Sequence, residues 1–429
     1  MKKKYRIILY TSIFLLCVVA SIILVVKKSN SVYEEESKPK VVKHKSMLSM
    51  NLEQTAGSGD YKTVTQSSWP TEGYKFNAEL SKCENGSTLS WDDTKKAVIV
   101  SGNLSDKCYV YFDIYQPTLA EYIKSQYTGT QGENNIYYHD SDLANGAGDN
   151  SYRYAGANPN NFVCFGTIES PCPIDNLYRI IGVFGENYHG ANGKQLVKLI
   201  KYDYMTTDEL GTDGDYSQTY KEWGMDSTYK GTYGDGERIG VYYWNYKATG
   251  SATNTWSTSL LNKTNLNTNF INNIGTTWAN KIATVTWKVG GNTWANIGTK
   301  TSSVAYTNEI TNPVTTNTTD NATTYSAKIG LMYVSDYGFA ASPDAWTLTM
   351  SSYNNTTATN NNWMYMGLYE WTISRYADNS GSAFGVSIDG GVHSYYVDNN
   401  YGVRASFNLE SSVSYVSGSG SMSDPIVIN

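Results

Sequence analysis

Four cysteines lie in two pairs that are close in sequence, and disulfide formation is the first chemistry that this chain offers. Cys83 is followed by Cys108, and Cys164 by Cys172, whereas Cys17 lies in an apolar N-terminal segment. An even number of cysteines outside the cell favours disulfides, and three pairings are formally possible. Zinc ligation is disfavoured, because neither pair has C-x-x-C spacing and the 4 histidines lie far apart in sequence. We predict the bridges Cys83–Cys108 and Cys164–Cys172, each within one module.

Histidine and carboxylate side chains are present, but no catalytic motif contains them. His139, His189 and His393 follow the apolar segment, and the G-x-S-x-G motif of serine hydrolases is absent. A Ser-His-Asp site is assembled only by folding, so spacing does not decide whether one exists. With 39 acidic residues, carboxylate pairs of the kind that glycosidases use are available whatever the function is. The sequence leaves enzymatic activity uncertain and favours a protein that is not an enzyme.

Acidic turns are the remaining candidates for ion binding. Asp140, Asp142 and Asp149 form one group, and Asp213 and Asp215 form another. Neither group matches the D-x-[DN]-x-[DN]-G-x5-E calcium loop, and solvated acids in turns are the commoner case. We therefore predict no metal site and no cofactor.

Aromatic and amide side chains give the chain its most distinctive surface chemistry. Aromatic residues make up 14% of the sequence, with 37 Tyr, whereas charged residues make up 17%. Rigid rings beside short polar side chains are typical of binding surfaces. The alternative is a β-rich protein whose tyrosines lie half-buried on strands. Two segments carry this character, and we predict a ligand-binding face from Trp363, Tyr365, Tyr395, Tyr396, Asp398, Asn399 and Tyr401.

An apolar segment near the N-terminus predicts where this face is displayed. Residues 7–26 carry no charge and have the length of a helix that crosses a bilayer. Lys2, Lys3, Lys4 and Arg6 precede this segment and place the N-terminus inside the cell and the bulk of the chain outside. A cleaved signal peptide is the alternative, but no A-x-A-like site follows. We therefore predict a single-pass cell-membrane protein. The net charge of −6 argues against nucleic-acid binding.

The rest of the chain divides by composition. We predict a cytoplasmic stub and transmembrane anchor over 1–28, a flexible tether over 29–46, a small β module over 47–113, a connector with a short helix and a loop over 114–160, and one large domain over 161–429. Within the large domain, 177–184 and 196–202 predict a hairpin and 256–274 predicts the main helix. The last 60 residues predict a strand meander.

Several strings in residues 115–429 resemble a large group of uncharacterised surface proteins of gut Firmicutes. The strings are RYAGANPNNFVCFG at 153–166, KIGLMYVSDYG at 328–338, EWTISR at 370–375, GVR at 402–404, FNL at 407–409, SGSG at 417–420 and DPI at 424–426. The group has no assigned activity.

The C-terminal strings also resemble, more distantly, the C-type-lectin-like fold shared with formylglycine-generating enzymes and the variable proteins of diversity-generating retroelements. Trp371, Gly390-Gly391 and Gly402-Val403-Arg404 carry this resemblance, and Ala405 stands where the group commonly has Pro. It implies an α+β fold whose 391–401 region lies beside the ligand face. Formylglycine chemistry is not implied, because no Cys follows Cys172, and the calcium-dependent sugar motifs are absent.

Together these features predict an adhesin-like protein of the cell surface. It would consist of an N-terminal transmembrane helix, a small all-β module and a C-type-lectin-like α+β domain. We expect it to bind a glycan or a host or microbial surface protein through the aromatic face, without catalysis. A cell-wall or glycan hydrolase and a structural surface component are the alternatives.

Overall fold

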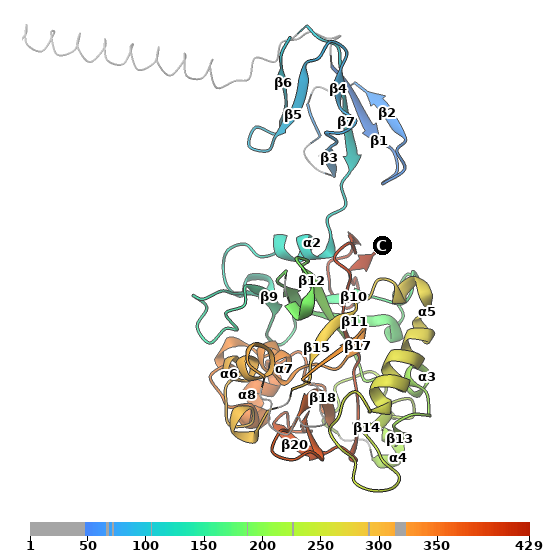
Figure 1. Ribbon diagram of the computed structural model, residues 1–429, viewed down its shortest axis with the longest axis vertical. Helices are drawn as coiled ribbons and strands as arrows, with labels where there is room; N and C mark the ends of the chain where they lie inside the picture. Colours follow the sequence, from blue (N-terminus) through green and yellow to red (C-terminus); the bar gives the residue numbers. More distant parts are fainter. Residues whose placement is uncertain are drawn as a thin grey trace, which may run out of the picture. The chain divides into compact units, whose positions relative to one another are not determined.

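The computed structural model describes residues 48–429 except 66–67, 71–72, 104, 187, 225–226, 291 and 314–322. The chain forms two compact units, and the boundary falls between Tyr115 and Gln116. Figure 1 shows the described part of the N-terminal unit in blue to teal and the C-terminal unit in teal to red. Each unit has its own hydrophobic core.

The regular elements in the described residues of the N-terminal unit are all strands. Its larger sheet has the order β2-β1-β7-β3, with β4 also paired to β7, and β5 and β6 form a separate hairpin. Strand β1 runs parallel to β7, whereas the other pairs are antiparallel. Aromatic rings of Trp69, Phe76 and Trp91 surround Phe112 in the core. The strands are β1 (Leu48–Glu53), β2 (Tyr61–Val64), β3 (Tyr74–Phe76), β4 (Lys82–Cys83), β5 (Thr88–Asp92), β6 (Ala97–Ser101) and β7 (Cys108–Ile114).

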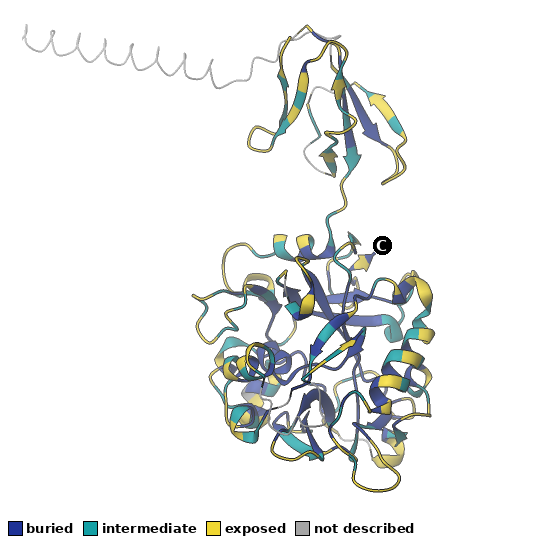
Figure 2. Cartoon of the chain, viewed as in Figure 1, coloured by how far each residue is buried: buried dark blue, intermediate teal, exposed yellow. Residues whose placement is uncertain are grey.

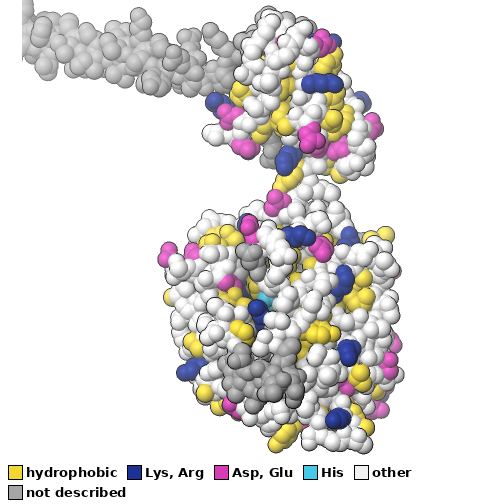
Figure 3. Space-filling model, in the orientation of Figure 1, with side chains coloured by type: hydrophobic (Ala, Val, Ile, Leu, Met, Phe, Trp, Pro, Cys, Tyr) yellow, Lys and Arg dark blue, Asp and Glu magenta, His cyan; other side chains and the backbone are white. Residues whose placement is uncertain are grey.

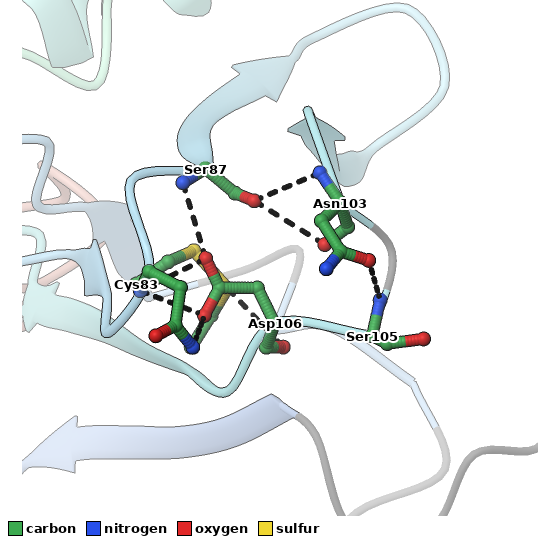
Figure 4. The surroundings of a disulfide bond; sticks show 7 residues. Cys83, Ser87, Asn103, Ser105 and Asp106 are labelled. Carbon is green, nitrogen blue, oxygen red and sulfur yellow. Dashed lines mark hydrogen bonds between the residues drawn. A yellow bond between two sulfur atoms is a disulfide. The ribbon is translucent and has the colours of Figure 1, made fainter.

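A disulfide and a buried carboxylate hold the turns of this unit together. Cys83 in β4 is bonded to Cys108 in β7, its direct partner in the strand register. The Asp106 carboxylate accepts the backbone N–H groups of Asn85 and Ser87, and Ser87 in turn contacts Asn103 (Figure 4). A second disulfide, Cys164–Cys172, lies in the C-terminal unit. Both bridges match the nearest-neighbour pairing, and they are consistent with an extracellular protein.

The C-terminal unit is centred on a sheet of seven strands. Its order is β17-β22-β12-β11-β9-β8, with β10 also paired to β11. The two central strands form the predicted hairpin and are buried along their whole length (Figure 2). The strands are β8 (Ile136–His139), β9 (Ser151–Tyr154), β10 (Phe162–Cys164), β11 (Leu177–Phe184), β12 (Leu196–Lys201), β17 (Ile329–Gly330) and β22 (Ser406–Asn408).

Four smaller antiparallel sheets and short helices pack around this sheet (Figure 1). The strands are β13 (Tyr216–Thr219), β14 (Gly240–Tyr243) and β21 (Asn400–Tyr401); β18 (Glu370–Arg375), β19 (Ser382–Val386) and β20 (Val392–Tyr396); β15 (Val285–Lys288) and β16 (Thr324–Ala327); β23 (Tyr415–Ser417) and β24 (Val427–Ile428). The α-helices are α2 (Leu119–Ser125), α3 (Thr207–Leu210), α4 (Tyr220–Trp223), α5 (Ile271–Ala279), α6 (Ser302–Tyr306), α7 (Val334–Ala340) and α8 (Thr356–Asn360).

The remaining helical turns are of two other kinds. The 3-10 turns are η1 (Glu133–Asn135), η2 (Ile174–Asn176), η3 (Tyr188–Gly190), η5 (Trp294–Asn296), η7 (Pro343–Ala345) and η8 (Met350–Asn354). The π-helical segments are η4 (Leu261–Phe270) and η6 (Thr307–Thr311).

The predicted fold class is wrong. The fold is mixed and consists mostly of strands with few helices, rather than an α+β C-type-lectin-like domain behind a transmembrane helix. The predicted main helix over 256–274 begins only at Leu261, and its first part is π-helical. Side chains favour this wider helix, because Asn267 and Thr268 donate to carbonyl groups five residues earlier, those of Asn262 and Lys263. The predicted C-terminal meander is also interrupted, since β22 joins the central sheet between β12 and β17.

The predicted membrane anchor is corrected as well. Within the described part of the chain, none of the helices has the length and apolar character that a bilayer span requires. The anchor over 1–28 and the tether over 29–46 lie outside the described residues. The membrane as a partner and a single-pass cell-membrane localisation are therefore not retained.

A buried ion pair joins β18 to the segment that precedes β22. Arg404 Nε lies 2.8 Å from Glu370 Oε1 and Arg404 Nη2 lies 2.9 Å from Glu370 Oε2. The guanidinium also donates to the Met364 carbonyl at 2.6 Å. Both side chains are almost completely buried. A bidentate pair of this kind fixes the relative position of three backbone segments.

We expect Glu370→Gln to lower the free energy of unfolding of the C-terminal unit by about 3 kcal/mol or more, because the substitution leaves a buried guanidinium without its counter-ion. Urea denaturation of the full chain measures this loss. Glu410→Gln is the matched control, since its partner Lys194 is half-exposed, and we expect a change within about 1 kcal/mol. Equal effects of the two substitutions would contradict the assigned role.

Replacing both Cys83 and Cys108 by Ser should destabilise the N-terminal unit by about 3 kcal/mol, because the bridge closes a loop across a sequence separation of 25 residues. The same change at Cys164 and Cys172, which are separated by 8 residues, should cost less and affect the C-terminal unit. Hydrogen exchange of backbone amides, measured at increasing denaturant concentration, shows which unit unfolds. An unchanged midpoint for the first variant would show that the bridge does not stabilise its unit.

Candidate functional site

The predicted aromatic face does not form as a single exposed patch. Trp363, Tyr365 and Tyr401 are only 4%, 7% and 6% exposed. The Trp363 indole N–H donates to the Tyr154 carbonyl at 2.9 Å, and the Arg179 guanidinium lies 4.6 Å from its ring centroid. The Tyr365 hydroxyl donates to the Ile388 carbonyl. These two rings are parts of the core, because their polar atoms are bonded to backbone inside the unit.

Two of the remaining predicted residues, Tyr395 and Tyr396, point to opposite faces of strand β20. The Tyr395 ring packs against Tyr401 at 5.0 Å and Tyr369 at 5.7 Å, whereas Tyr396, on the opposite side of the strand, is 63% exposed. The Asn399 amide donates to the Tyr401 hydroxyl at 3.0 Å, and Asp398 is exposed. Trp223, which the sequence analysis missed, adds a 38% exposed ring beside Tyr369 and Tyr401.

A pocket on another part of the C-terminal unit is the stronger candidate site. It has a volume of about 810 Å³, and four of its lining residues are tyrosines from β8, β9, η3 and α6: Tyr138, Tyr152, Tyr188 and Tyr306. Polar side chains between the rings include Lys124, Asp149, Asn150, Glu186, Gln195 and Lys288. Figure 3 shows a histidine and a basic side chain close together on this face of the unit. Pockets of this size enclose small-molecule ligands.

Two of the tyrosines form a platform at the pocket. Tyr138 and Tyr152 are directly opposite each other in the β8–β9 register, and their rings stack at 4.6 Å with 28° between the planes. The Tyr138 hydroxyl lies 3.1 Å from the Asn150 amide oxygen. Lys124 lies 5.9 Å from the Tyr152 ring centroid and donates to Gln195. Half-buried rings are thus surrounded by groups that donate and accept hydrogen bonds.

A chain of buried ions lies beneath the pocket. Arg153 is 2.7 Å from Asp149 and 3.7 Å from Asp336, and Asp336 is 2.6 Å from Lys198. Lys198 also lies 3.3 Å from the hydroxyl of Tyr188, which lines the pocket. The buried Glu309 carboxylate accepts hydrogen bonds from the backbone N–H groups of Val334 and Ser335, the two residues that precede Asp336. The ion chain therefore fixes both the acid and a tyrosine of the pocket.

Ionisation at the site follows from burial and from these neighbours. Burial opposes the charge of Asp149, but Arg153 together with hydrogen bonds from Ser151 and Tyr306 outweighs it, and the pKa of this carboxyl falls to about 2. Burial, together with Lys198 and other cations, holds the pKa of His189 well below its usual range. Burial likewise raises the pKa of Glu309. The pocket thus presents an ionised Asp149 and a neutral His189 at neutral pH.

The arrangement is suited to holding a ligand rather than to proton transfer. Asp149 stays ionised and cannot act as a general acid. Both ring nitrogens of His189 are buried, and neither has a hydrogen-bond partner among the described residues. Within the described ranges, no group of three or more His, Cys, Asp or Glu side chains is placed to hold a metal ion. Asp140 and Asp142 do not join Asp149 in lining the pocket.

The sequence analysis missed the pocket because its parts are far apart in the chain. The predicted connector over 114–160, with its short helix and loop, contains the strands β8 and β9. The signal that marks these strands is the aromatic character of the segments IYYH and SYRY, each of which has two tyrosines. Their pairing with each other, and with β11, is a long-range property that local patterning does not reveal.

Comparison of the chain with protein-family models, with curated proteins and with solved structures finds no match. The resemblance to the surface-protein group therefore stays a prediction.

Two buried histidines predict an acid-sensitive fold. Burial, and the field of Arg153, hold the pKa values of His139 and His189 well below 6.5, so the folded state keeps both neutral. The unfolded state binds protons as pH falls below about 6.5, so stability decreases over that range by up to about 1.4 kcal/mol per pH unit for each histidine.

His189→Phe tests this effect, because phenylalanine keeps the stacking on Tyr188, seen at 3.8 Å, without titrating. Between pH 6.5 and 5 we expect the free energy of unfolding of this variant to fall less steeply than that of the wild type. The difference in slope should be up to about 1.4 kcal/mol per pH unit, the contribution of one histidine. Parallel pH profiles for the two proteins would show that His189 does not contribute.

Proposed function

We propose that this protein is a non-catalytic glycan-binding protein whose site is the tyrosine-lined pocket of the C-terminal unit. One observation carries the proposal: four tyrosines and several amide or charged side chains line a single cavity of about 810 Å³. A sugar ring has an apolar C–H face and a rim of hydroxyl groups. The pocket offers rings for the first and hydrogen-bonding groups for the second.

The platform of Tyr138 and Tyr152 supplies the stacking surface. Both rings sit on paired strands at the edge of the central sheet, so they are held in place before a ligand arrives. Preorganised rings lose little conformational entropy on binding. The side chains of Asn150 and Gln195, which also line the pocket, supply amide groups for ligand hydroxyls.

The ion chain supports binding without turnover. Hydrolysis of a glycosidic bond needs one carboxyl group that can give up a proton near neutral pH. The pKa of Asp149 is about 2, because Arg153 is its close partner, so this group stays ionised. Glu186, the other carboxylate of the lining, is exposed at the surface. A glycan hydrolase remains the second candidate, on the ground that these two carboxylates share one pocket.

The proposal predicts that Tyr152→Ala weakens glycan binding at least tenfold, because truncation of an anchoring ring typically costs about 2 kcal/mol. The measurement is binding of the full, disulfide-intact chain to a panel of soluble host, plant and bacterial-wall oligosaccharides, followed by calorimetry with each one that binds. Thermal unfolding checks that the variant stays folded. Analysis of the bound oligosaccharide for cleavage products distinguishes a binding protein from a hydrolase.

Trp223→Ala is the matched control, because Trp223 is an exposed ring of the other aromatic cluster and does not line the pocket. We expect it to leave pocket binding unchanged. The proposal fails if no oligosaccharide of the panel binds, or if Tyr152→Ala binds as tightly as the wild type. Loss of binding with Trp223→Ala alone would move the site to the cluster around Tyr369 and Tyr401.

A further inference from the structure

Lys198 and Asp336 are held in an unusually enclosed contact. Lys198 lies in β12 and Asp336 in the first turn of α7, and their side chains are 0% and 2% exposed. Lys198 Nζ is 2.6 Å from Asp336 Oδ2. The backbone N–H of Tyr333 donates to the same oxygen at 3.0 Å, which fixes the orientation of the carboxyl group.

Aromatic rings form a shell around the amine. Tyr333, Trp287, Tyr188 and Phe184 have ring centroids 4.5, 5.2, 5.9 and 6.0 Å from Lys198 Nζ. Such surroundings keep bulk water away and raise the free energy of both charges. Burial accordingly lowers the pKa of Lys198, although Asp336 opposes the shift. The neutral amine that a nucleophilic reaction requires therefore forms more easily here than it would on an exposed lysine.

We propose that Lys198 and Asp336 condense to an intramolecular amide that covalently joins β12 to α7. A proton passes from the ammonium group to the carboxylate across the existing hydrogen bond. The amine nitrogen then attacks Cγ, the Nζ–Cγ bond forms and one Cγ–O bond breaks. The departing hydroxide takes a second proton from the nitrogen and leaves as water. Atoms and charge balance without an oxidant, a reductant or another reactant.

The neighbouring groups favour this condensation. Arg153 Nη1 lies 3.7 Å from Asp336 Oδ1, where the negative charge of the tetrahedral intermediate develops. Two reacting groups fixed in contact behave as if each were at a very high concentration, which favours the amide over its hydrolysis. Tyr188, whose hydroxyl lies 3.3 Å from Lys198 Nζ, is also a lining residue of the pocket, and we expect the water to leave on that side.

The charges that remain after condensation are balanced. The reaction removes one positive and one negative charge from the ion chain, and Arg153 keeps Asp149 at 2.7 Å as its partner. Both carboxylate oxygens of the nearby Glu309 keep their hydrogen bonds from the backbone N–H groups of Val334 and Ser335. The site therefore loses two desolvated ions without leaving a third unpaired.

A second buried lysine provides an internal control. Lys201 Nζ lies 2.7 Å from Glu209 Oε1, but Glu209 is 11% exposed and its other oxygen caps a helix by accepting from Thr206. Among the described residues, one aromatic ring, that of Tyr178, lies within about 6 Å of Lys201 Nζ, at 5.6 Å. Both carboxylates, Glu209 and Asp336, accept the backbone N–H group at the start of their helix, so the cap does not separate the two pairs. Because the Lys201–Glu209 pair is less enclosed, we expect it to stay an ion pair.

Mass spectrometry of the full chain tests the proposal. After reduction of the disulfides, the wild-type protein should weigh less than its sequence requires by the mass of one water. Trypsin does not cleave after an acylated lysine, so the digest should contain residues 195–201 joined to residues 329–375. The peptide 202–221, which holds Glu209, should be free.

Two variants give matched controls. Lys198→Met should show the full mass of its own sequence, and Asp336→Asn should condense with loss of ammonia instead of water. Wild-type protein of full mass, with separate peptides 195–198 and 199–201, would overturn the proposal. So would a water loss that maps to Asp336 alone or to Lys201 and Glu209. The wild-type measurement decides the matter even if a variant does not fold, and it is independent of whether any glycan binds.

Discussion

The buried pair of Arg404 and Glu370 is the constraint on which much of the C-terminal unit depends. Moving a guanidinium and a carboxylate out of water is costly, so the pair persists only in a site that satisfies nearly all of their hydrogen-bonding groups. That requirement brings the Met364 carbonyl to the guanidinium and joins Glu370 to Gly402 in a backbone bridge. The segment between Met364 and Glu370 is thereby fixed, and with it the ring of Tyr369 that stacks on Tyr401.

This constraint explains why the aromatic residues near the C-terminus form core rather than a recognition face. Tyr401 lies between Tyr369 and Trp371, with ring centroids 4.8 and 4.6 Å away, and most of its ring surface is covered. Aromatic side chains contribute more to stability when they are buried against one another than when they are left in water. Trp223 in α4 and Tyr396 in β20 stay exposed.

The pocket depends on a second group of buried ions, which links elements that are distant in sequence. Arg153 comes from β9, Lys198 from β12 and Asp336 from α7. Their contacts hold Asp149 and Tyr188 at the pocket, so these buried ions determine which polar groups line its inner wall. A fixed, charged floor beneath half-buried rings combines rigidity with hydrogen-bonding capacity, which a glycan-binding site requires.

The sequence by itself determined the local features of this protein. The cysteine spacing predicted the two bridges, and the apolar runs predicted the β11–β12 hairpin, because both depend on residues that are close in the chain. The strings that contain Glu370, Arg404 and Asp336 were singled out, but their pairing was not, since oppositely charged partners from separate segments leave no periodic signal. Tertiary structure alone decided which tyrosines are buried, that β22 enters the central sheet, and that β8, β9, η3 and α6 meet around one pocket. Each of these outcomes depends on long-range packing and on the cost of burying charge. Local sequence patterns do not reveal these two factors, because both depend on residues that are far apart in the chain.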